Sequence, residues 1–538
     1  MFAIACVHRT LLLALFGGAA ATTVWPAPAH ATLSERRLVL ANDFAFRIAG
    51  STTSPLLTAA ATRSKQRLAK SGAFAPTGGL AEVVVTADSS AETLNFGVDE
   101  SYTLLVANGT ASITAPTIFG AMHGLESFVQ LADNFGPVAQ QYLAVPSEVH
   151  IRDEPRFEWR GLMIDTARHF YPLSAIQHII DTMAASKLNV LHIHFTDDQS
   201  FPVESVSWPE LHKQGAFRSP AGEPLTYSQQ DLHALVQYAT GRGVIVVPEF
   251  DMPAHTSAWG AGYPQYMAQR PRALFDHGDA IRPDLNATYP FLDSLLAELA
   301  ALFPTSEFLH LGGDELPLDA WAGNASVAAW MKARGLDNDG AMSYFVNRVK
   351  NGPKLSAAGK TLVYWEEVFA SCAKSGTSLP DGTVVQAWKS NAMPAVLSAG
   401  HRVTNSYKWY LNHGCDNFGD GNWPAFYENE PTAFVPASTP PEQLKQIVGG
   451  ETTMWAECVD SINFDAVVWP RAAAAAEKLW SPANATRRAT ADVVVRLAEH
   501  RCRLVARGVN AAPLNDAQKK IEAGQSTSSS RVFLAGCF

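Results

Sequence analysis

The sequence predicts an α/β protein in which a small α/β domain precedes a (β/α)₈ barrel. Three observations lead to this prediction. Apolar strands alternate with helical patterns after Trp159, and nearly every such strand ends in carboxylates or aromatic residues. The stretch before Pro155 has a different pattern of apolar residues. Eight strands with helical crossovers over about 330 residues are typical of a closed barrel. An open doubly wound sheet is the alternative, but no glycine-rich phosphate loop follows the first strand.

Composition limits the possible partners. The chain has 538 residues, 47% of them hydrophobic and 17% charged, which is ordinary for a globular protein. At ~100–200 residues per domain, this length predicts two to four domains. The formal net charge is -10 and no cluster of Lys or Arg is present, so nucleic acid is not expected as a partner. We expect a signal peptide at 1–31, a companion domain at 32–155, the barrel at 156–505 and a C-terminal tail at 506–538.

The first 31 residues have the pattern of a secretory signal. His8 and Arg9 precede the apolar run 11–16, and Ala29-His30-Ala31 has the small-x-small form of a cleavage site. An uncleaved anchor is the alternative, but the apolar core is shorter than the ~20 residues that span a bilayer. No later stretch is long enough either, so we expect no stable membrane span. The predicted location is the secretory pathway, lysosomal or extracellular.

Cysteines and glycosylation sequons agree with export. Of six cysteines, Cys6 leaves with the signal, and the remaining five leave at least one thiol free or paired with another chain. Four Asn-x-Ser/Thr sequons are candidate glycosylation sites. They start at Asn108, Asn286, Asn324 and Asn484.

Short strands and one helix are expected before the barrel. Residues 81–88, 102–107 and 111–115 have strand patterns, the last two separated by Asn108-Gly109-Thr110. Residues 118–131 have the periodicity of an amphipathic helix. We find no candidate chemistry in this domain.

The barrel strands are expected from their apolar runs. The predicted strands are 161–165, 189–195, 244–250, 308–311, 361–365, 383–388, 403–407 and 447–451. Helical patterns separate most of them, for example at 175–186, 228–241 and 289–303.

Polar and aromatic residues gather where these strands end. A barrel active site lies at the C-terminal ends of its strands. Each residue alone could be a satisfied surface group, but together they predict a pocket in which indole walls lie beside carboxylates, as suits a sugar. In chain order they are Asp165, Arg168 and His169; Asp197 and Asp198; Glu249, Asp251 and His255; Asp314 and Glu315; Trp365, Glu366 and Glu367; Trp388; Trp409 and Tyr410; and Trp455 and Glu457.

The stretch from His310 to Glu315 is the most informative of these ends. An apolar run stops at two glycines and then presents Asp314 and Glu315 side by side. Adjacent carboxylates do not ionise together easily, so the pKa of one is expected to rise. A strand that ends in a solvated acidic turn is the alternative.

Several of these motifs together resemble glycoside hydrolase family 20, most closely the eukaryotic, lysosomal-type β-N-acetylhexosaminidases. The resemblance runs from about Val98 to Cys537 and includes the first domain. The motifs that carry it are Arg160–His169, His194–Pro202, Pro248–His255, His310–Glu315, Trp365–Phe369, Trp409–Leu411 and Trp455–Glu457.

The resemblance implies an exo-acting, retaining glycosidase that releases terminal β-linked N-acetylglucosamine or N-acetylgalactosamine. The family is a substrate-assisted exception among glycosidases, in which the acetamido oxygen attacks the anomeric carbon to give an oxazolinium intermediate. By resemblance Glu315 is the general acid and base, Asp314 orients the acetamido N–H, and Tyr410 binds the acetamido oxygen. Trp365, Trp388 and Trp455 would enclose the methyl group. No cofactor is implied, and no metal-ligand spacing appears.

Further roles follow by resemblance. Arg168 would bind the sugar hydroxyls O3 and O4, and Glu457 would accept from O4. Asp197 and His255 would support Glu315. Asn412 stands where many relatives have an aspartate that contacts O6, so it would either tolerate a 6-sulfate or bind the 6-hydroxyl. The carboxylates Asp198, Glu249, Glu366 and Glu367 stay unassigned.

Some alternatives remain open. Cys502 and Cys537 match the C-terminal disulfide of relatives, whereas any two of Cys372, Cys415 and Cys458 could pair. The competing functions are a catalytically silent sugar-binding protein and a chitinase-type endohydrolase, whose Asp-x-x-Asp-x-Asp-x-Glu signature is absent. Expected substrates are oligosaccharides such as chitobiose, glycoprotein glycans or glycolipids, and a homodimer is possible.

Overall fold

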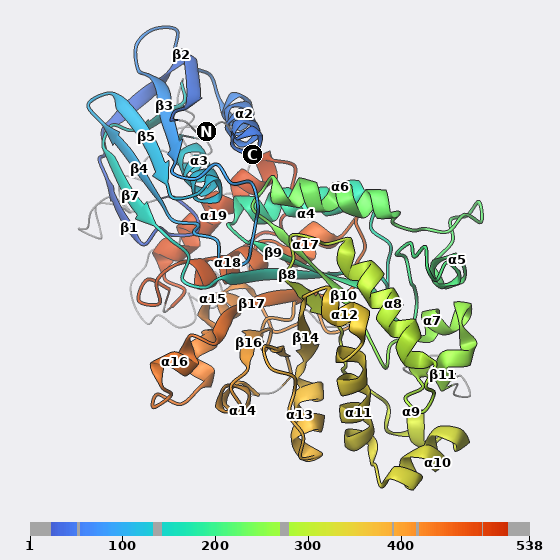
Figure 1. Ribbon diagram of the computed structural model, residues 1–538. Helices are drawn as coiled ribbons and strands as arrows, with labels where there is room; N and C mark the ends of the chain where they lie inside the picture. The colour runs from blue at the N-terminus through green and yellow to red at the C-terminus, as the bar shows by residue number, and fades with distance from the viewer. Residues whose placement is uncertain are drawn as a thin grey trace.

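The computed structural model describes residues 23–50, 54–132, 142–268, 279–389, 392–415, 419–486 and 488–514. A seven-stranded sheet with two helices forms the first part of the chain, and a closed barrel of eight strands forms the second (Figure 1). The predicted fold class is therefore confirmed.

The small domain is a mixed sheet with both helices packed on it. Its strand order is β1-β7-β4-β5-β3-β2-β6. The β4–β5 hairpin turns at Asn108 and Gly109, which both have positive φ, as a tight hairpin requires. The predicted strands β3, β4 and β5 and the helix α3 are confirmed, while the other elements were not predicted. The elements are β1 His30–Leu33, β2 Arg37–Ile48, α2 Pro55–Ser71, β3 Leu80–Ala87, β4 Tyr102–Ala107, β5 Thr110–Ala115, α3 Ile118–Ala132, β6 Ala144–Pro146 and β7 Val149–Asp153.

The segment just before this sheet corrects the expected end of the signal peptide. Trp25 is fully buried; its backbone N–H donates to Gln130 and its indole N–H to the Ala473 carbonyl. Strand β1 then pairs with β7. Cleavage after Ala31 would remove Trp25 from the core and break β1, so that boundary does not fit the fold. A removable leader has to end before Val24.

Eight parallel strands close the barrel. The order is β8-β9-β10-β13-β14-β15-β16-β17, and β17 returns to pair with β8. Each of the eight predicted strands overlaps one observed strand. They are β8 Trp159–Asp165, β9 Val190–Thr196, β10 Ile245–Phe250, β13 Phe308–His310, β14 Thr361–Trp365, β15 Val384–Ala387, β16 Arg402–Asn405 and β17 Ile447–Met454.

Helices surround the barrel (Figure 1). A capping box between Ser228 and Asp231 starts α6. In the part of the chain that the structure describes, no helix combines the length and the hydropathy needed to cross a membrane. The helices are α4 Leu173–Ala185, α5 Glu210–Gly215, α6 Gln229–Thr240, α7 Ser257–Gly262, α8 Thr288–Ala301, α9 Leu318–Ala322, α10 Ala325–Arg334, α11 Asn338–Lys350, α12 Pro353–Ala357, α13 Glu366–Lys374, α14 Met393–Ser398, α15 Trp423–Glu428, α16 Pro441–Leu444, α17 Phe464–Val468, α18 Arg471–Trp480 and α19 Ala491–Ala506.

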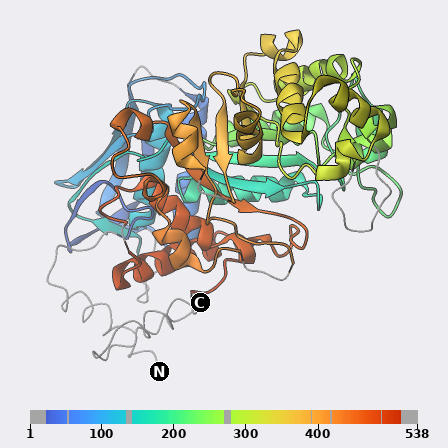
Figure 2. The ribbon, with the colours of Figure 1, turned by 90° about the horizontal axis from the view of Figure 1, so that it is seen from below.

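The small domain closes one end of the barrel. Its Phe96 packs against Trp159 and Phe308, the first residues of β8 and β13, with ring centroids 5.9 and 4.9 Å away. Both views place this domain, in blue, to one side of the barrel and beside the red C-terminal helices (Figures 1 and 2). Since the strand starts are covered, the carboxyl ends of the strands form the end where a barrel site is expected.

Candidate active site

The turn after β13 presents two carboxylates. Gly312 and Gly313 have φ of 63° and 96°. A Cβ on Gly312 would lie 1.7 Å from Asp251 Oδ1, and one on Gly313 would lie 2.2 Å from Val368 Cγ2. Glycine is therefore required at both positions. Glu315 itself has φ 48°, a left-handed conformation that non-glycine residues adopt mostly at constrained or functional positions.

Asp314 and Glu315 lie in different environments. Asp314 is 5% exposed, whereas the Glu315 side chain is 38% exposed. Burial and the nearby carboxylates Glu367 and Glu249, among others, outweigh the attraction of His255 and raise the pKa of Asp314 to about 7. The raised pKa expected for one member of the pair is thus found at Asp314. Within the described residues, Asp314 Oδ1 is buried and has no hydrogen-bond partner.

Asp197 and His255 lie together behind this pair. His255 Nδ1 is 3.2 Å from Asp197 Oδ1, and its Nε2 is 3.6 Å from Glu315 Oε2. Burial lowers the pKa of His255, but Asp197, Asp251 and Asp314 outweigh it and hold that pKa well above its ordinary value. These carboxylates favour the protonated form of the imidazole next to Glu315.

Arg168 connects the ends of the first two strands. Its terminal nitrogens lie 3.1 Å from Asp165 Oδ2 and 2.8 Å from Asp197 Oδ2, and its Nε donates to Gln199. The guanidinium also lies over the Trp455 ring, 5.0 Å from its centroid. These contacts leave one N–H on each terminal nitrogen for a ligand. Glu457, expected nearby, is exposed at the rim.

The predicted aromatic residues form one continuous wall. Trp365 lies 6.3 Å from Trp388 and 6.1 Å from Trp455 between ring centroids. Tyr410 stacks on Trp388 at 5.5 Å. Burial and, next, the charge of Asp314 raise the pKa of the Tyr410 hydroxyl well above its ordinary value, so it remains a hydrogen-bond donor. The wall can enclose a small apolar group beside a donor and a carboxylate.

Two of the unassigned carboxylates hold Trp388. Glu366 accepts from the Trp388 backbone N–H at 2.9 Å, and Glu367 accepts from its indole N–H at 3.0 Å. Asp198 accepts from the Ser257 backbone N–H at 2.9 Å. All three carboxylates therefore hold neighbouring protein groups in place.

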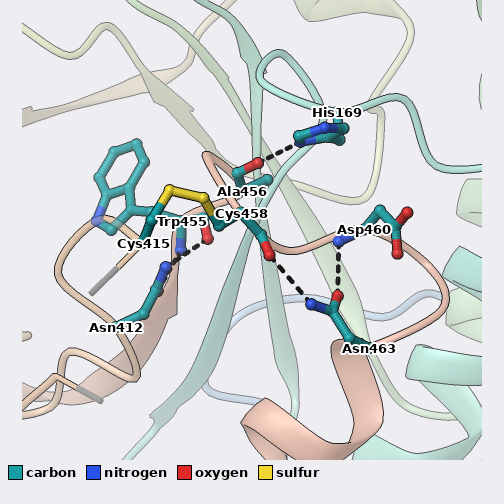
Figure 3. The surroundings of a disulfide bond; sticks show 8 residues. All are labelled: His169, Asn412, Cys415, Trp455, Ala456, Cys458, Asp460 and Asn463. Atoms are coloured by element: carbon teal, nitrogen blue, oxygen red, sulfur yellow. Dashed lines mark hydrogen bonds between the residues drawn. A yellow bond between two sulfur atoms is a disulfide. The ribbon is translucent and has the colours of Figure 1, made fainter. Parts of the chain in front are cut away.

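Asn412 has a partner that the sequence did not indicate. Its Nδ2 donates to the Trp455 carbonyl at 2.8 Å, and its Oδ1 accepts from the Trp455 N–H at 3.0 Å (Figure 3). Because both ends of the amide bind the backbone of Trp455, Asn412 orients that wall residue. The contact of Asn412 with a sugar O6, and the tolerance of a 6-sulfate, stay predictions.

A disulfide joins the same two loops. Of the three cysteines left open, Cys415 and Cys458 pair, and Cys372 is buried and free. Figure 3 shows the bridge beside the Asn412–Trp455 contact and the contact of His169 with the Ala456 carbonyl. Cys502 is disulfide-bonded, and Cys537 lies outside the described residues. Of the sequon asparagines, Asn108, Asn286 and Asn484 are exposed, and Asn324 caps α10.

One site residue escaped the sequence reasoning. Asp420 accepts from the Tyr410 backbone N–H at 2.7 Å, and it lies in a loop without a recognisable motif. Asp251 was expected among the strand-end residues but without a role, and it accepts from the Gly313 N–H at 2.9 Å.

Some buried groups lie close enough to share an ion. Among the described residues, the ligand atoms of His192, Glu249 and His310 are within 4.8 Å of one another, as are those of Asp251, His255 and Asp314. Both sets are already engaged in hydrogen bonds or close ion pairs with their neighbours, which fits charge pairing without requiring a metal.

Comparison with known proteins agrees with this geometry. The family model described as glycosyl hydrolase family 20, catalytic domain, matches residues 157–483, and the model described as beta-acetyl hexosaminidase like matches residues 24–131. Beta-hexosaminidase subunit beta of Felis catus is 38% identical over 446 residues, which cover 80% of this chain and 79% of that protein. Beta-hexosaminidase subunit alpha of Bos taurus is 36% identical over 535 residues, 94% of this chain and 96% of that protein. The solved Flavobacterium johnsoniae chitobiase superposes with a TM-score of 0.79 at 29% identity and covers 94% of this chain and 76% of its own.

Proposed function

The chain belongs to glycosyl hydrolase family 20, and we propose that it is an exo-acting, retaining β-N-acetylhexosaminidase that uses the acetamido group of its substrate as the nucleophile. The substrate class is a terminal, non-reducing β-linked N-acetylglucosamine or N-acetylgalactosamine.

One observation carries the proposal. A buried carboxylate oxygen, Asp314 Oδ1, has no partner among the described residues and belongs to the same site as the Tyr410 hydroxyl and three tryptophans. An unsatisfied buried acceptor is costly unless a ligand supplies a donor. An acetamide supplies an N–H for Asp314, a carbonyl oxygen for Tyr410 and a methyl group for the indole wall.

The first chemical step breaks the glycosidic bond. The acetamido carbonyl oxygen attacks the anomeric carbon as the bond to the leaving oxygen breaks, and Glu315 transfers its proton to that oxygen. The exposed position of Glu315 gives it access to a leaving group outside the buried pocket. The oxazolinium that forms carries positive charge on nitrogen. That charge favours the ionised form of Asp314, and the carboxylate in turn stabilises it.

The second step returns the enzyme to its starting state. Glu315 takes a proton from water, whose oxygen attacks the anomeric carbon and reopens the oxazolinium ring. Two inversions at one carbon give overall retention. The free N–H groups of Arg168 and the carboxylate of Glu457 would bind the sugar hydroxyls, with Arg168 held in place by Asp165 and Asp197.

We further propose that the protein acts in the secretory pathway, in a lysosomal or extracellular compartment. The disulfide between Cys415 and Cys458 supports an oxidising environment. A leader that ends before Val24 keeps Trp25 in the core, and Ala19-Ala20-Ala21 offers a small-x-small site there. Chitobiose, glycoprotein glycans and glycolipids remain the proposed natural substrates, and a homodimer the proposed assembly.

A release assay tests this function. The purified protein is given 4-nitrophenyl β-glycosides of N-acetylglucosamine, N-acetylgalactosamine and glucose. The two N-acetyl substrates are expected to be cleaved, and the glucoside at least about a thousandfold more slowly because it lacks the internal nucleophile. Cleavage of the glucoside at a comparable rate would refute the mechanism.

A further inference from the structure

A carboxylate in the barrel interior, Glu249, is connected to both halves of the active site. Glu249 is fully buried and lies on β10 below the strand ends. Its Oε1 accepts from the Trp365 indole N–H at 2.8 Å, and its Oε2 lies 2.7 Å from His194 Nδ1. The rings of His192 and His310 approach the same two oxygens at 3.0 and 3.1 Å. Trp365 and His194 therefore each bind one oxygen of Glu249, with the rings of His192 and His310 close by.

One set of contacts leads from Glu249 to the acid. His194 Nε2 lies 2.8 Å from Asp197 Oδ2. Asp197 contacts His255 through its other oxygen, and His255 Nε2 lies 3.6 Å from Glu315 Oε2. Histidines and carboxylates alternate along this path, which we name the histidine relay: His194, Asp197 and His255.

The other set leads to the aromatic wall. The Trp365 indole, fixed by Glu249, lies near both Trp388 and Trp455 in the wall. An indole N–H in a barrel interior needs an acceptor, since an unpaired donor there is costly. Glu249 supplies that acceptor and so sets the ring plane of Trp365.

The charges along the relay alternate. Burial lowers the pKa of His194, but Glu249 and Asp197 outweigh burial and raise it to about 10. The three histidines around Glu249, in turn, overcome its burial and hold the pKa of Glu249 well below its ordinary value. A cationic imidazole donates from both nitrogens, so His194 has a single hydrogen-bonding arrangement between Glu249 and Asp197.

We propose that Glu249 is a positioning residue: it orients the histidine relay toward Glu315, and it holds Trp365 of the aromatic wall toward the acetamido group. This inference rests on the proposed function, because it assigns Glu249 to the same reaction. Glu249 does not contact the substrate itself. It acts by fixing His194 in its doubly donating form and by holding Trp365.

The variant Glu249→Gln removes the charge of the side chain and keeps its shape. The glutamine oxygen can still accept from Trp365, but its amide group presents N–H bonds to imidazole nitrogens that also donate. One imidazole must then lose its proton, and the alternation of charge along the relay is lost. Proton transfer from Glu315 should therefore be reduced more than binding of the acetamido group by the aromatic wall.

Glu451 offers a matched control in the same core. It is also fully buried and has three partners: His192, Gln386 and Trp159 lie 2.8, 2.6 and 3.0 Å from its carboxylate. Glu451 shares His192 with Glu249 but contacts neither His194 nor Trp365. Glu451→Gln therefore removes a buried charge without removing a direct contact of either path.

The experiment compares leaving groups. kcat/KM is measured for wild type, Glu249→Gln and Glu451→Gln with a 4-nitrophenyl β-N-acetylglucosaminide, which needs little protonation, and with chitobiose, which needs a full proton transfer. Glu249→Gln should lose at least about tenfold more activity on chitobiose than on the nitrophenyl substrate, within the range of general acid catalysis. Glu451→Gln should lose the same fraction on both.

Each outcome decides a separate point. If wild type is active and Glu249→Gln loses the same fraction on both substrates, the inference is overturned while the proposed function stands. If wild type cleaves neither substrate, the proposed function fails. Should Glu249→Gln not fold, His194→Gln replaces it: this variant breaks the relay alone and should give the same preference for the nitrophenyl substrate. Equal losses in His194→Gln would likewise overturn the inference.

Discussion

Replacing Asp314 by asparagine should stabilise the protein while it removes the charge that is proposed to stabilise the oxazolinium. The folded state raises the pKa of this carboxyl from 3.8 to about 7. At 1.36 kcal/mol per pKa unit, that shift corresponds to about 4 kcal/mol as an upper value. Because the folded state binds this proton more tightly than the unfolded state, the protonated Asp314 makes its full contribution to stability below pH 3.8. That contribution is lost progressively as the pH rises toward 7.

The asparagine side chain carries no charge, so the variant does not lose stability in this way as the pH rises. The stability difference between Asp314→Asn and wild type should therefore be near zero at pH 4 and reach about 2–4 kcal/mol at pH 8. Urea unfolding followed by tryptophan fluorescence at pH 4, 6 and 8 measures it. Asp381→Asn, at an exposed position, is the control and should give no such trend. A difference that stays constant from pH 4 to pH 8 would refute the burial argument.

Three further variants test other parts of the site. Arg168→Lys should lower kcat/KM at least about tenfold, because one ammonium cannot bind Asp165 and Asp197 while it lies over an indole; unchanged kinetics would make Arg168 purely structural. The double variant Cys415→Ser/Cys458→Ser should raise KM several-fold, because it frees the loops that carry Tyr410 and Trp455. Its control, Cys372→Ser at the free buried thiol, should leave KM unchanged. Equal KM values in both variants would mean that the disulfide has no positioning role. Glu315→Gln should lower turnover by roughly 10²–10⁴ on poor leaving groups and less in the first step on nitrophenyl substrates; an equal loss in that step would exclude the acid role.

The barrel could be predicted because its strands are buried on both faces. Such strands read as continuous apolar runs bounded by polar ends, so each of the eight was found, and the site residues at their ends followed. In the small domain β2 has an irregular burial pattern, and β7 alternates buried and exposed residues over only five positions. Neither strand is a continuous apolar run, and both were missed.

Other features depend on contacts between distant segments. Trp25 packs into a core formed by distant segments, among them α3 and α18, so a local cleavage pattern misplaced the leader boundary. The contact of Asn412 with the backbone of Trp455 could not be predicted, because the two residues lie 43 positions apart in the sequence. The polar barrel interior had one visible signal: His192 and His194 alternate with apolar residues along a strand, which places both imidazoles on one face.

The most direct test of substrate assistance varies the acetamido group itself. A series of 4-nitrophenyl β-glycosides carrying N-acetyl, N-fluoroacetyl, N-difluoroacetyl and N-trifluoroacetyl groups differs mainly in the nucleophilicity of the carbonyl oxygen. If that oxygen attacks the anomeric carbon, each added fluorine should lower kcat/KM, and the whole series should span at least about a hundredfold, or ~3 kcal/mol of activation free energy. A series with equal rates would mean that a protein group or water attacks instead, and would contradict the mechanism.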